Sequence, residues 1–152
     1  MATLRDTPYS AFNFLVEIEP GQGDAVIAGF SEVSGLNTEI AVAEYRAGNY
    51  KVNHVTKIPG IHKAGDVTLK RGVIGAQNLY LWMEEVRNGN ISAAKRTIVI
   101  KLLSENRAET VLFWKLKGAM PIKWTGPTLT AKGGGDVAIE ELVLSVEMID
   151  QE

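Results

Sequence analysis

The sequence predicts a mostly β fold: a two-sheet β-sandwich or barrel with one packed α-helix and a long interfacial arm. Runs of alternating apolar and polar residues, separated by glycine and proline turns, recur along most of the chain. A single segment has the spacing of an amphipathic helix. The 152 residues contain no composition shift or linker that would divide them, so we expect one domain spanning residues 1–152.

The N-terminal part of the chain predicts an arm followed by three strands. Residues 1–10 are polar and indicate an extended arm. Residues 11–19 alternate, and the apolar side of this half-buried strand consists of Phe12, Phe14, Val16 and Ile18. A glycine-rich turn leads to a short strand at 25–30. Residues 37–46 alternate again and predict a further strand.

Residues 47–65 differ from the rest because their apolar residues follow no period. Glycines and prolines interrupt the segment, which is long for a connection inside a compact domain. It is too apolar for a solvated linker, since it contains Tyr50, Val52, Val55, Ile58 and Ile61. We therefore expect an arm that packs on a neighbouring subunit.

The helix is predicted over residues 76–88. Four apolar residues at i, i+3, i+4 and i+7 form one stripe: Leu79, Trp82, Met83 and Val86. Gly89 follows the last turn and can adopt the positive φ that ends helices. The stripe predicts a helix that covers a sheet, with its charged residues on the outer side.

The C-terminal half reads as strands. Residues 96–104 and 110–118 are joined by a short polar turn and predict an antiparallel hairpin. Residues 120–125 contain Pro121, which suits an edge strand or a bulge. Residues 137–148 alternate and predict a final strand after a glycine-rich turn.

Composition excludes several classes of protein. The chain has 16 basic and 18 acidic residues, and this net charge of −2 argues against specific nucleic-acid binding. Cysteine is absent, which excludes disulfides and thiolate chemistry. No apolar run approaches the ~20 residues that span a bilayer, so we expect no membrane anchoring. The N-terminus lacks the apolar core of a signal peptide.

We find no residues arranged for catalysis, and predict no enzyme, cofactor or metal site. The two histidines, His54 and His62, are eight residues apart on the expected arm. The glycines at 133–135 precede a strand rather than a helix, so they do not form a phosphate-binding loop. Two other functions fit the strand content: a monomeric β-barrel that binds an apolar ligand, or a glycan-binding β-sandwich that uses Trp114 or Trp124.

Several stretches, in order and with ordinary spacing, resemble the inner tube proteins of contractile phage tails and contractile injection systems. They are AGFSEVSGLNTEIAVAEYRAG, KIPGIHKAGDVTLKRG, NLYLWMEEVRNG and WKLKGAMPIKWTGPTLTAKGGGDVAIEELVLSVE, at Ala28–Gly48, Lys57–Gly72, Asn78–Gly89 and Trp114–Glu147. Together they cover most of the chain. The turn at 133–135 is more glycine-rich than the family pattern.

The resemblance implies a structural protein. Six copies would close a ring by extending sheets edge to edge around a lumen. Rings would stack into a hollow tube inside a contractile sheath, ending at a baseplate and at tube-terminating proteins. Sheath contraction would drive the tube, and the lumen would conduct cargo, either protein effectors or DNA. The protein would be made in the bacterial cytoplasm without a signal peptide and assembled into a phage tail or tail-like particle. A type VI secretion tube or a baseplate protein with the same fold is a near alternative.

This reading assigns three groups of candidate residues. Expected inter-subunit contacts are Tyr45, Arg46, Ile58, Pro59, Gly60, Lys70 and Arg71. Candidates for a sheath-facing helix surface are Glu84, Glu85 and Arg87. Polar-face residues that could line the lumen are Glu17, Glu19, Lys101, Lys115, Glu141, Ser145 and Glu147. A near-neutral lumen suits a conduit, because a conduit must not hold a charged cargo tightly.

Overall fold

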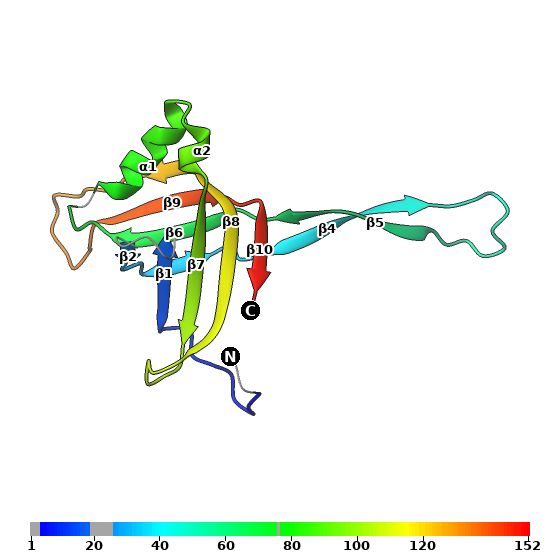
Figure 1. Ribbon diagram of the computed structural model, residues 1–152, viewed down its shortest axis with the longest axis horizontal. Coiled ribbons are helices and arrows are strands. Elements are labelled where there is room, and N and C mark those ends of the chain that lie inside the picture. Colours follow the sequence, from blue (N-terminus) through cyan, green and yellow to red (C-terminus); the bar gives the residue numbers. More distant parts are fainter. Residues whose placement is uncertain (1–3, 19–25, 76) are drawn as a thin grey trace.

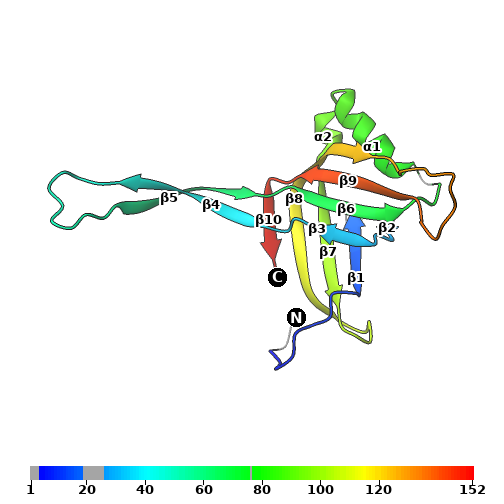
Figure 2. The ribbon, with the colours of Figure 1, turned by 180° about the vertical axis from the view of Figure 1, so that it is seen from behind.

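The computed structural model describes residues 4–18, 26–75 and 77–152. Its elements, in chain order, are β1 (Phe14–Ile18), β2 (Val26–Ala28), β3 (Glu32–Ser34), β4 (Thr38–Tyr45), β5 (Thr56–Ala64), β6 (Val67–Gly72), α1 (Asn78–Arg87), α2 (Ile91–Ala94), β7 (Arg96–Leu103), β8 (Thr110–Thr125), β9 (Ile139–Ser145) and β10 (Met148–Gln151). The expected mostly β architecture is confirmed (Figures 1 and 2). The predictions for Glu19 and the turn at 20–24 lie outside the described residues.

The strands form one strongly bent eight-stranded sheet, which has two layers. The first layer is β2-β1-β7-β8, with β10 also paired to β8. The second layer is β8-β9-β6-β3, and all of these pairs are antiparallel. Apolar side chains from both inner faces meet in one buried cluster, in which Val16, Ile100, Leu69 and Leu142 are fully or almost fully buried. Each such side chain contributes about 1.5–3 kcal/mol of burial free energy.

Strand β8 joins the two layers, and here the sequence prediction was wrong in detail. Residues 110–118 and 120–125 were expected as separate strands, but they form one strand of 16 residues. Gly118 lies where β8 changes partner and has a φ of 64°, a value that other residues rarely adopt. A Cβ at this position would lie 2.5 Å from the Glu147 carboxylate. The register shift after Pro121 confirms the predicted bulge.

The predicted final strand at 137–148 is two strands in the structure. β9 pairs with β6 and with the second half of β8, whereas β10 pairs with the first half of β8. Between them the backbone N–H of Glu147 donates to the carbonyl of Lys117. The chain therefore changes layer at this point, and the predicted alternation ends here: Met148, expected on the apolar side, is exposed, whereas Ile149 packs on the core.

Helix α1 covers one end of the sheet, as Figure 1 shows, and packs against β8. Three residues of the predicted stripe face the core, since Leu79 and Trp82 are buried and Val86 packs on the core, whereas Met83 is only half-buried. The Trp82 indole N–H donates to the carbonyl of Ala94, 2.6 Å away. This bond ties α1 to the short helix α2, which the sequence analysis did not predict.

Strands β4 and β5 form a separate two-stranded hairpin. It projects from the side of the domain, and in both views it extends well beyond the other elements (Figures 1 and 2). Its register runs from Thr38 opposite Ala64 to Tyr45 opposite Thr56. The aperiodic arm expected at 47–65 is thus half of a hairpin that begins at Thr38. The extra residue of a bulge in β5 disturbs the alternation, which is why the sequence pattern concealed this strand.

The N-terminal arm is tied to the turn between β7 and β8. Arg5 Nη2 lies 2.6 Å from Glu105 Oε1, and Arg5 Nη1 lies 3.2 Å from Glu105 Oε2. The same guanidinium donates to the carbonyls of Thr7 and Pro8 and lies 3.8 Å from the centre of the Tyr9 ring. The hydrogen bond from Arg5 lowers the pKa of Glu105 from 4.5 to about 2.

We expect Glu105→Gln to release this arm. Because the pKa of Glu105 is lowered in the folded protein, the ion pair stabilises the docked arm above pH 4.5 and is lost as the pH falls towards about 2. The variant should show faster tryptic cleavage after Arg5 and faster amide exchange in residues 4–10 at neutral pH. Glu109→Gln, in the same turn, is the matched control. Equal cleavage rates in both variants would contradict the assignment.

Candidate assembly surfaces

The β4–β5 hairpin exposes apolar side chains on both of its faces. Ala43 lies opposite Ile58 on one face, while Ile40 and Val42 lie on the other. Ile58 is 49% exposed and Ile61 is 78% exposed. Isolated two-stranded hairpins are marginally stable in water, and contiguous exposed apolar surface marks interaction sites. The hairpin therefore has the properties of a segment that becomes covered on assembly.

The five predicted contact residues on the hairpin have different roles. Tyr45 and Ile58 expose about half of their side chains, so both are available to a partner. Arg46 donates a hydrogen bond to Asn53 across the hairpin tip, with a distance of 3.1 Å. A Cβ on Gly60 would lie 3.0 Å from the carbonyl oxygen of Ala41, so this glycine allows close approach of the two strands beside Pro59.

Arg71 corrects the sequence prediction, which placed it at the subunit interface. Its side chain is 2% exposed and its Nε donates to Glu140 Oε1 on the neighbouring strand. Its Nη2 also donates to Asn78 Oδ1 at the start of α1. The reason lies in strand parity, because Arg71 shares the inner face of β6 with Val67 and Leu69. By contrast, Lys70 points to the outer face and pairs with Glu32 at 3.6 Å.

The sequence marks Arg71 and Glu140 each as a charge at a core position, although it does not show that they are partners. Arg71 continues an apolar alternation in β6, and Glu140 begins one in β9 with Leu142 and Leu144. A buried charge is costly unless it is paired, so two opposite charges at core positions of adjacent strands predict each other. In the structure Arg71 and Glu140 are directly opposite in the ladder.

The charged surface of α1 makes its ion pairs within the chain. Glu84 pairs with Arg87 at 2.7 Å, and Glu85 pairs with the part-buried Arg96 at 3.1 Å. Arg87 also donates to the Tyr80 hydroxyl. Next to these charges, Leu81 is exposed on the helix surface. The three predicted residues thus lie together on the outer surface of α1. Through its ion pair with Arg96, Glu85 also connects this helix to the start of β7.

The polar outer face of the first layer brings together three of the predicted lumen residues. Glu17 on β1 pairs with Lys101 on β7 at 2.9 Å. Lys115 on β8 lies opposite Asp150 on β10, so it shares this face. The same Asp150 pairs with Lys117 at 2.8 Å. Charges on this face are therefore largely neutralised by neighbouring strands.

The remaining predicted lumen residues lie elsewhere. Glu141 is opposite Lys70 on the outer face of the second layer, and Ser145 follows four residues later on the same face. Glu147 lies between β9 and β10 and pairs with Lys95 beside α2 at 2.6 Å. The sequence grouped these residues because they alternate along one strand, whereas the chain changes layer after Ser145.

The first layer ends in strands that pair on one side. In the described part of the chain, β2 pairs with β1 and β10 pairs with β8, and no further strand continues the layer past either one. Such edges present unpaired backbone N–H and C=O groups, which are a template for pairing with another chain. The layer can therefore be extended at both edges by copies of itself.

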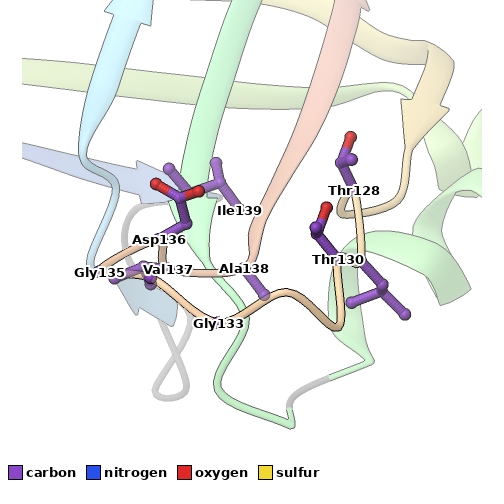
Figure 3. Close-up of a pocket in the computed structure, with 10 residues that line it drawn as sticks. Thr128, Thr130, Gly133, Gly135, Asp136, Val137, Ala138 and Ile139 are labelled. Atoms are coloured by element: carbon purple, nitrogen blue, oxygen red, sulfur yellow. The ribbon is translucent and has the colours of Figure 1, made fainter.

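The structure offers little support for a small-molecule site. A hollow of about 650 Å³ lies in the curl of the loop between β8 and β9, and all its lining residues come from Thr128 to Ile139 (Figure 3). Trp114 and Trp124 both pack against the core, and their indole N–H groups donate to Gln151 and Glu140. Neither ring is therefore an open platform for a sugar.

Residues 4–18, 26–75 and 77–152 lack two further features. These segments contain no cluster of three or more His, Asp or Glu side chains arranged to hold a metal ion. They also contain no helix with the length and apolarity needed to cross a membrane.

Comparison with known protein families identifies the family of this chain. The family model described as T4-like virus tail tube protein gp19 matches residues 10–150. The chain belongs to this tail tube family. The resemblance noted in the sequence is thereby confirmed. Among curated proteins, none matches the sequence.

Solved structures give the same result. A chain of an extracellular contractile injection system, the PVC sheath-tube complex in its extended state, is 26% identical with a TM-score of 0.82, covering 97% of this chain and 93% of that one. A chain of the sixfold-symmetrised anti-feeding prophage baseplate is 26% identical with a TM-score of 0.80, covering 97% of each chain. A chain of the anti-feeding prophage tube-terminating cap shares the fold, at 24% identity and a TM-score of 0.83, covering 100% and 95%.

Proposed function

We propose that this tail tube protein is the inner tube subunit of a contractile injection system or contractile phage tail. In this role, copies form hexameric rings, and the rings stack into a hollow tube inside a sheath. The role is structural and includes no catalytic step. The observation that carries the proposal is the projecting hairpin, whose apolar side chains are exposed on both faces. A monomeric ligand-binding barrel has no use for such an element.

The open edges of the first layer provide the means of ring closure. Pairing β10 of one copy with β2 of the next satisfies backbone groups at both edges and leaves none around a complete ring. A closed ring would also supply pairing partners for the outer sides of β2 and β10, where no strand of residues 4–18, 26–75 and 77–152 pairs. The sixfold order is carried over from the baseplate assembly that contains the similar chain.

We assign the lumen to the outer face of the first layer. Glu17 and Lys101 are paired there, as are Lys117 and Asp150, so positive and negative charges alternate across the strands. A surface of mixed and paired charge has no strong field to retain a charged cargo. Cargo, whether protein or DNA, would slide along this face. Assembly in the bacterial cytoplasm would give the cargo access to the growing tube.

The sheath-facing role of α1 gives a separate test. Glu84→Lys reverses a charge on the exposed helix and breaks its surface pair with Arg87, which stabilises the fold little. We expect tubes to form normally but to lose co-sedimentation with the sheath protein. Glu109→Lys makes the same charge change in the β7–β8 turn and should leave sheath binding intact. Equal sheath binding by the two variants would remove α1 from the sheath interface.

Native mass spectrometry of the purified protein tests the proposed ring. The expected result is a species of six chain masses, together with multiples of six as concentration rises. A distribution dominated by monomers at every concentration would overturn the proposal and favour the ligand-binding barrel.

A further inference from the structure

The start of helix α1 is held by a side chain from the sheet rather than by a cap of its own. Within the described residues, Gln77 at the N-cap makes no capping side-chain hydrogen bond. Residues 78–81 also contain no acidic side chain to interact with the helix dipole. Instead, Nη2 of Arg71 donates to Oδ1 of Asn78, 2.5 Å away. This bond joins the first residue of α1 to the buried end of β6.

The Arg71 guanidinium is itself fixed by the second layer. Its Nε donates to Oε1 of Glu140 on β9, and the two side chains are 2% and 8% exposed. The other carboxylate oxygen of Glu140 accepts a hydrogen bond from the Trp124 indole on β8, 3.4 Å away. The Phe30 ring lies 6.0 Å from the guanidinium carbon. Residues on several strands therefore determine where Arg71 presents Nη2 to α1.

A second contact reaches α1 from the same buried pair. The Tyr80 ring packs edge-on against Trp124, with 5.4 Å between the ring centres and 70° between the ring planes. The Tyr80 hydroxyl accepts a hydrogen bond from Nη2 of Arg87 at 3.4 Å, and Arg87 pairs with Glu84 at 2.7 Å. Trp124 and Tyr80 thus connect the buried pair to the charged outer surface of the helix.

These contacts give the first turn of α1 a fixed orientation. Leu79 and Trp82 are 1% and 2% exposed and hold the helix against the core. Burial of apolar area is non-directional, whereas a hydrogen bond weakens steeply away from its preferred geometry. The ion pair between Glu85 and Arg96 ties the later turns to β7. The orientation of the first turn therefore depends on the contacts that begin at the buried pair.

We propose that the buried Arg71–Glu140 pair positions the sheath-facing surface of α1. The inference rests on the proposed tube function, in which this helix meets the sheath. Because the pair is buried, it acts on a partner only through α1, by way of Asn78 on one side and of Trp124 and Tyr80 on the other. A preorganised surface binds more tightly than one that must be ordered on binding. A subunit without the pair would fold and assemble but would bind the sheath more weakly.

The double variant Arg71→Met with Glu140→Met separates positioning from stability. Apolar side chains of similar volume often replace a buried ion pair without loss of stability, but they leave Asn78 without its donor. Hydrogen exchange reports on the first turn, where the N–H of Leu81 donates to the carbonyl of Gln77. We expect exchange there to be about tenfold faster, the factor that the loss of one charge-assisted hydrogen bond gives. Co-sedimentation of the assembled tubes with the sheath protein should fall.

Two further variants make the comparison specific. Asn78→Val removes only the accepting oxygen, keeps the ion pair and has nearly the same helix propensity, so it should reproduce the faster exchange. Val16→Ala is the matched control, because Val16 is fully buried on β1 in the first layer and its truncation lowers the stability of the fold. This control should leave the exchange of the first turn and the sheath binding unchanged.

The outcomes distinguish the positioning role from the tube function. A double variant that exchanges and binds the sheath like the natural protein would overturn the positioning role and leave the tube function standing. Faster exchange with unchanged sheath binding would overturn it as well, because sheath binding would then not need an ordered first turn. A natural protein that forms neither rings nor tubes would overturn the tube function, and the positioning role would fail with it.

Discussion

Arg71→Met is expected to lower the stability of the isolated subunit by about 3–5 kcal/mol, because it leaves Glu140 buried without its partner. For a domain of this size the loss corresponds to a melting temperature lower by roughly 10 °C. Asn78 also loses the guanidinium from which its side-chain oxygen accepts a hydrogen bond. Differential scanning fluorimetry of the purified variant measures the change.

The double variant Arg71→Met with Glu140→Met is the control for this prediction. Replacing both members of a buried ion pair by apolar residues of similar volume is often neutral, so the double variant should recover most of the lost stability. We therefore expect a double-mutant cycle to show a coupling energy between Arg71 and Glu140. If the single and double variants are equally destabilised, the buried pair is not the cause of the loss. If Arg71→Met melts like the natural protein, Arg71 is not buried as described.

Ile58→Asp is expected to shift tube assembly to a much higher protein concentration without unfolding the subunit. The side chain is half exposed in the isolated chain, so its replacement costs the fold little. Placed at an interface, the same change removes an apolar contact of about 1.5–3 kcal/mol and buries a charge in every copy. Each 1.4 kcal/mol corresponds to a factor of 10 in the association constant, so assembly should need at least a tenfold higher protein concentration.

Ile91→Asp supplies the matched control for the hairpin. This isoleucine is 42% exposed, close to the 49% of Ile58, and lies outside the hairpin at the start of α2. Sedimentation of the two variants over a concentration series should give tubes for Ile91→Asp and soluble subunits for Ile58→Asp, with equal melting temperatures. Tube yields that are the same for both variants would exclude Ile58 from the assembly interface.

The local signals in the sequence predicted the fold well where alternation and helical spacing were uninterrupted. The stripe on α1 and the β7–β8 hairpin are found at the expected residues, because burial on one face dictates the pattern there. The prediction failed where a strand is irregular or exposed on both faces. β5 contains Pro59, Gly60 and a bulge, and no core face imposes a period on it.

For the candidate surfaces, too, side-chain alternation predicted the location of a residue only where its strand stays in one layer. Parity along β1, β7 and β8 placed Glu17, Lys101 and Lys115 on a polar face, and the structure brings these residues onto one layer. Parity failed for Glu147, because the chain changes layer just before β10. The partner of Arg71 depends on strand order, which joins β6 to β9 across the sequence. Local patterns do not encode that order.

Negative-stain electron microscopy of the purified protein shows directly whether the chain assembles into rings and tubes. We expect sixfold rings with a central opening, which stack into hollow tubes as the protein concentration rises. A field of uniform, monomer-sized particles at every concentration would contradict it.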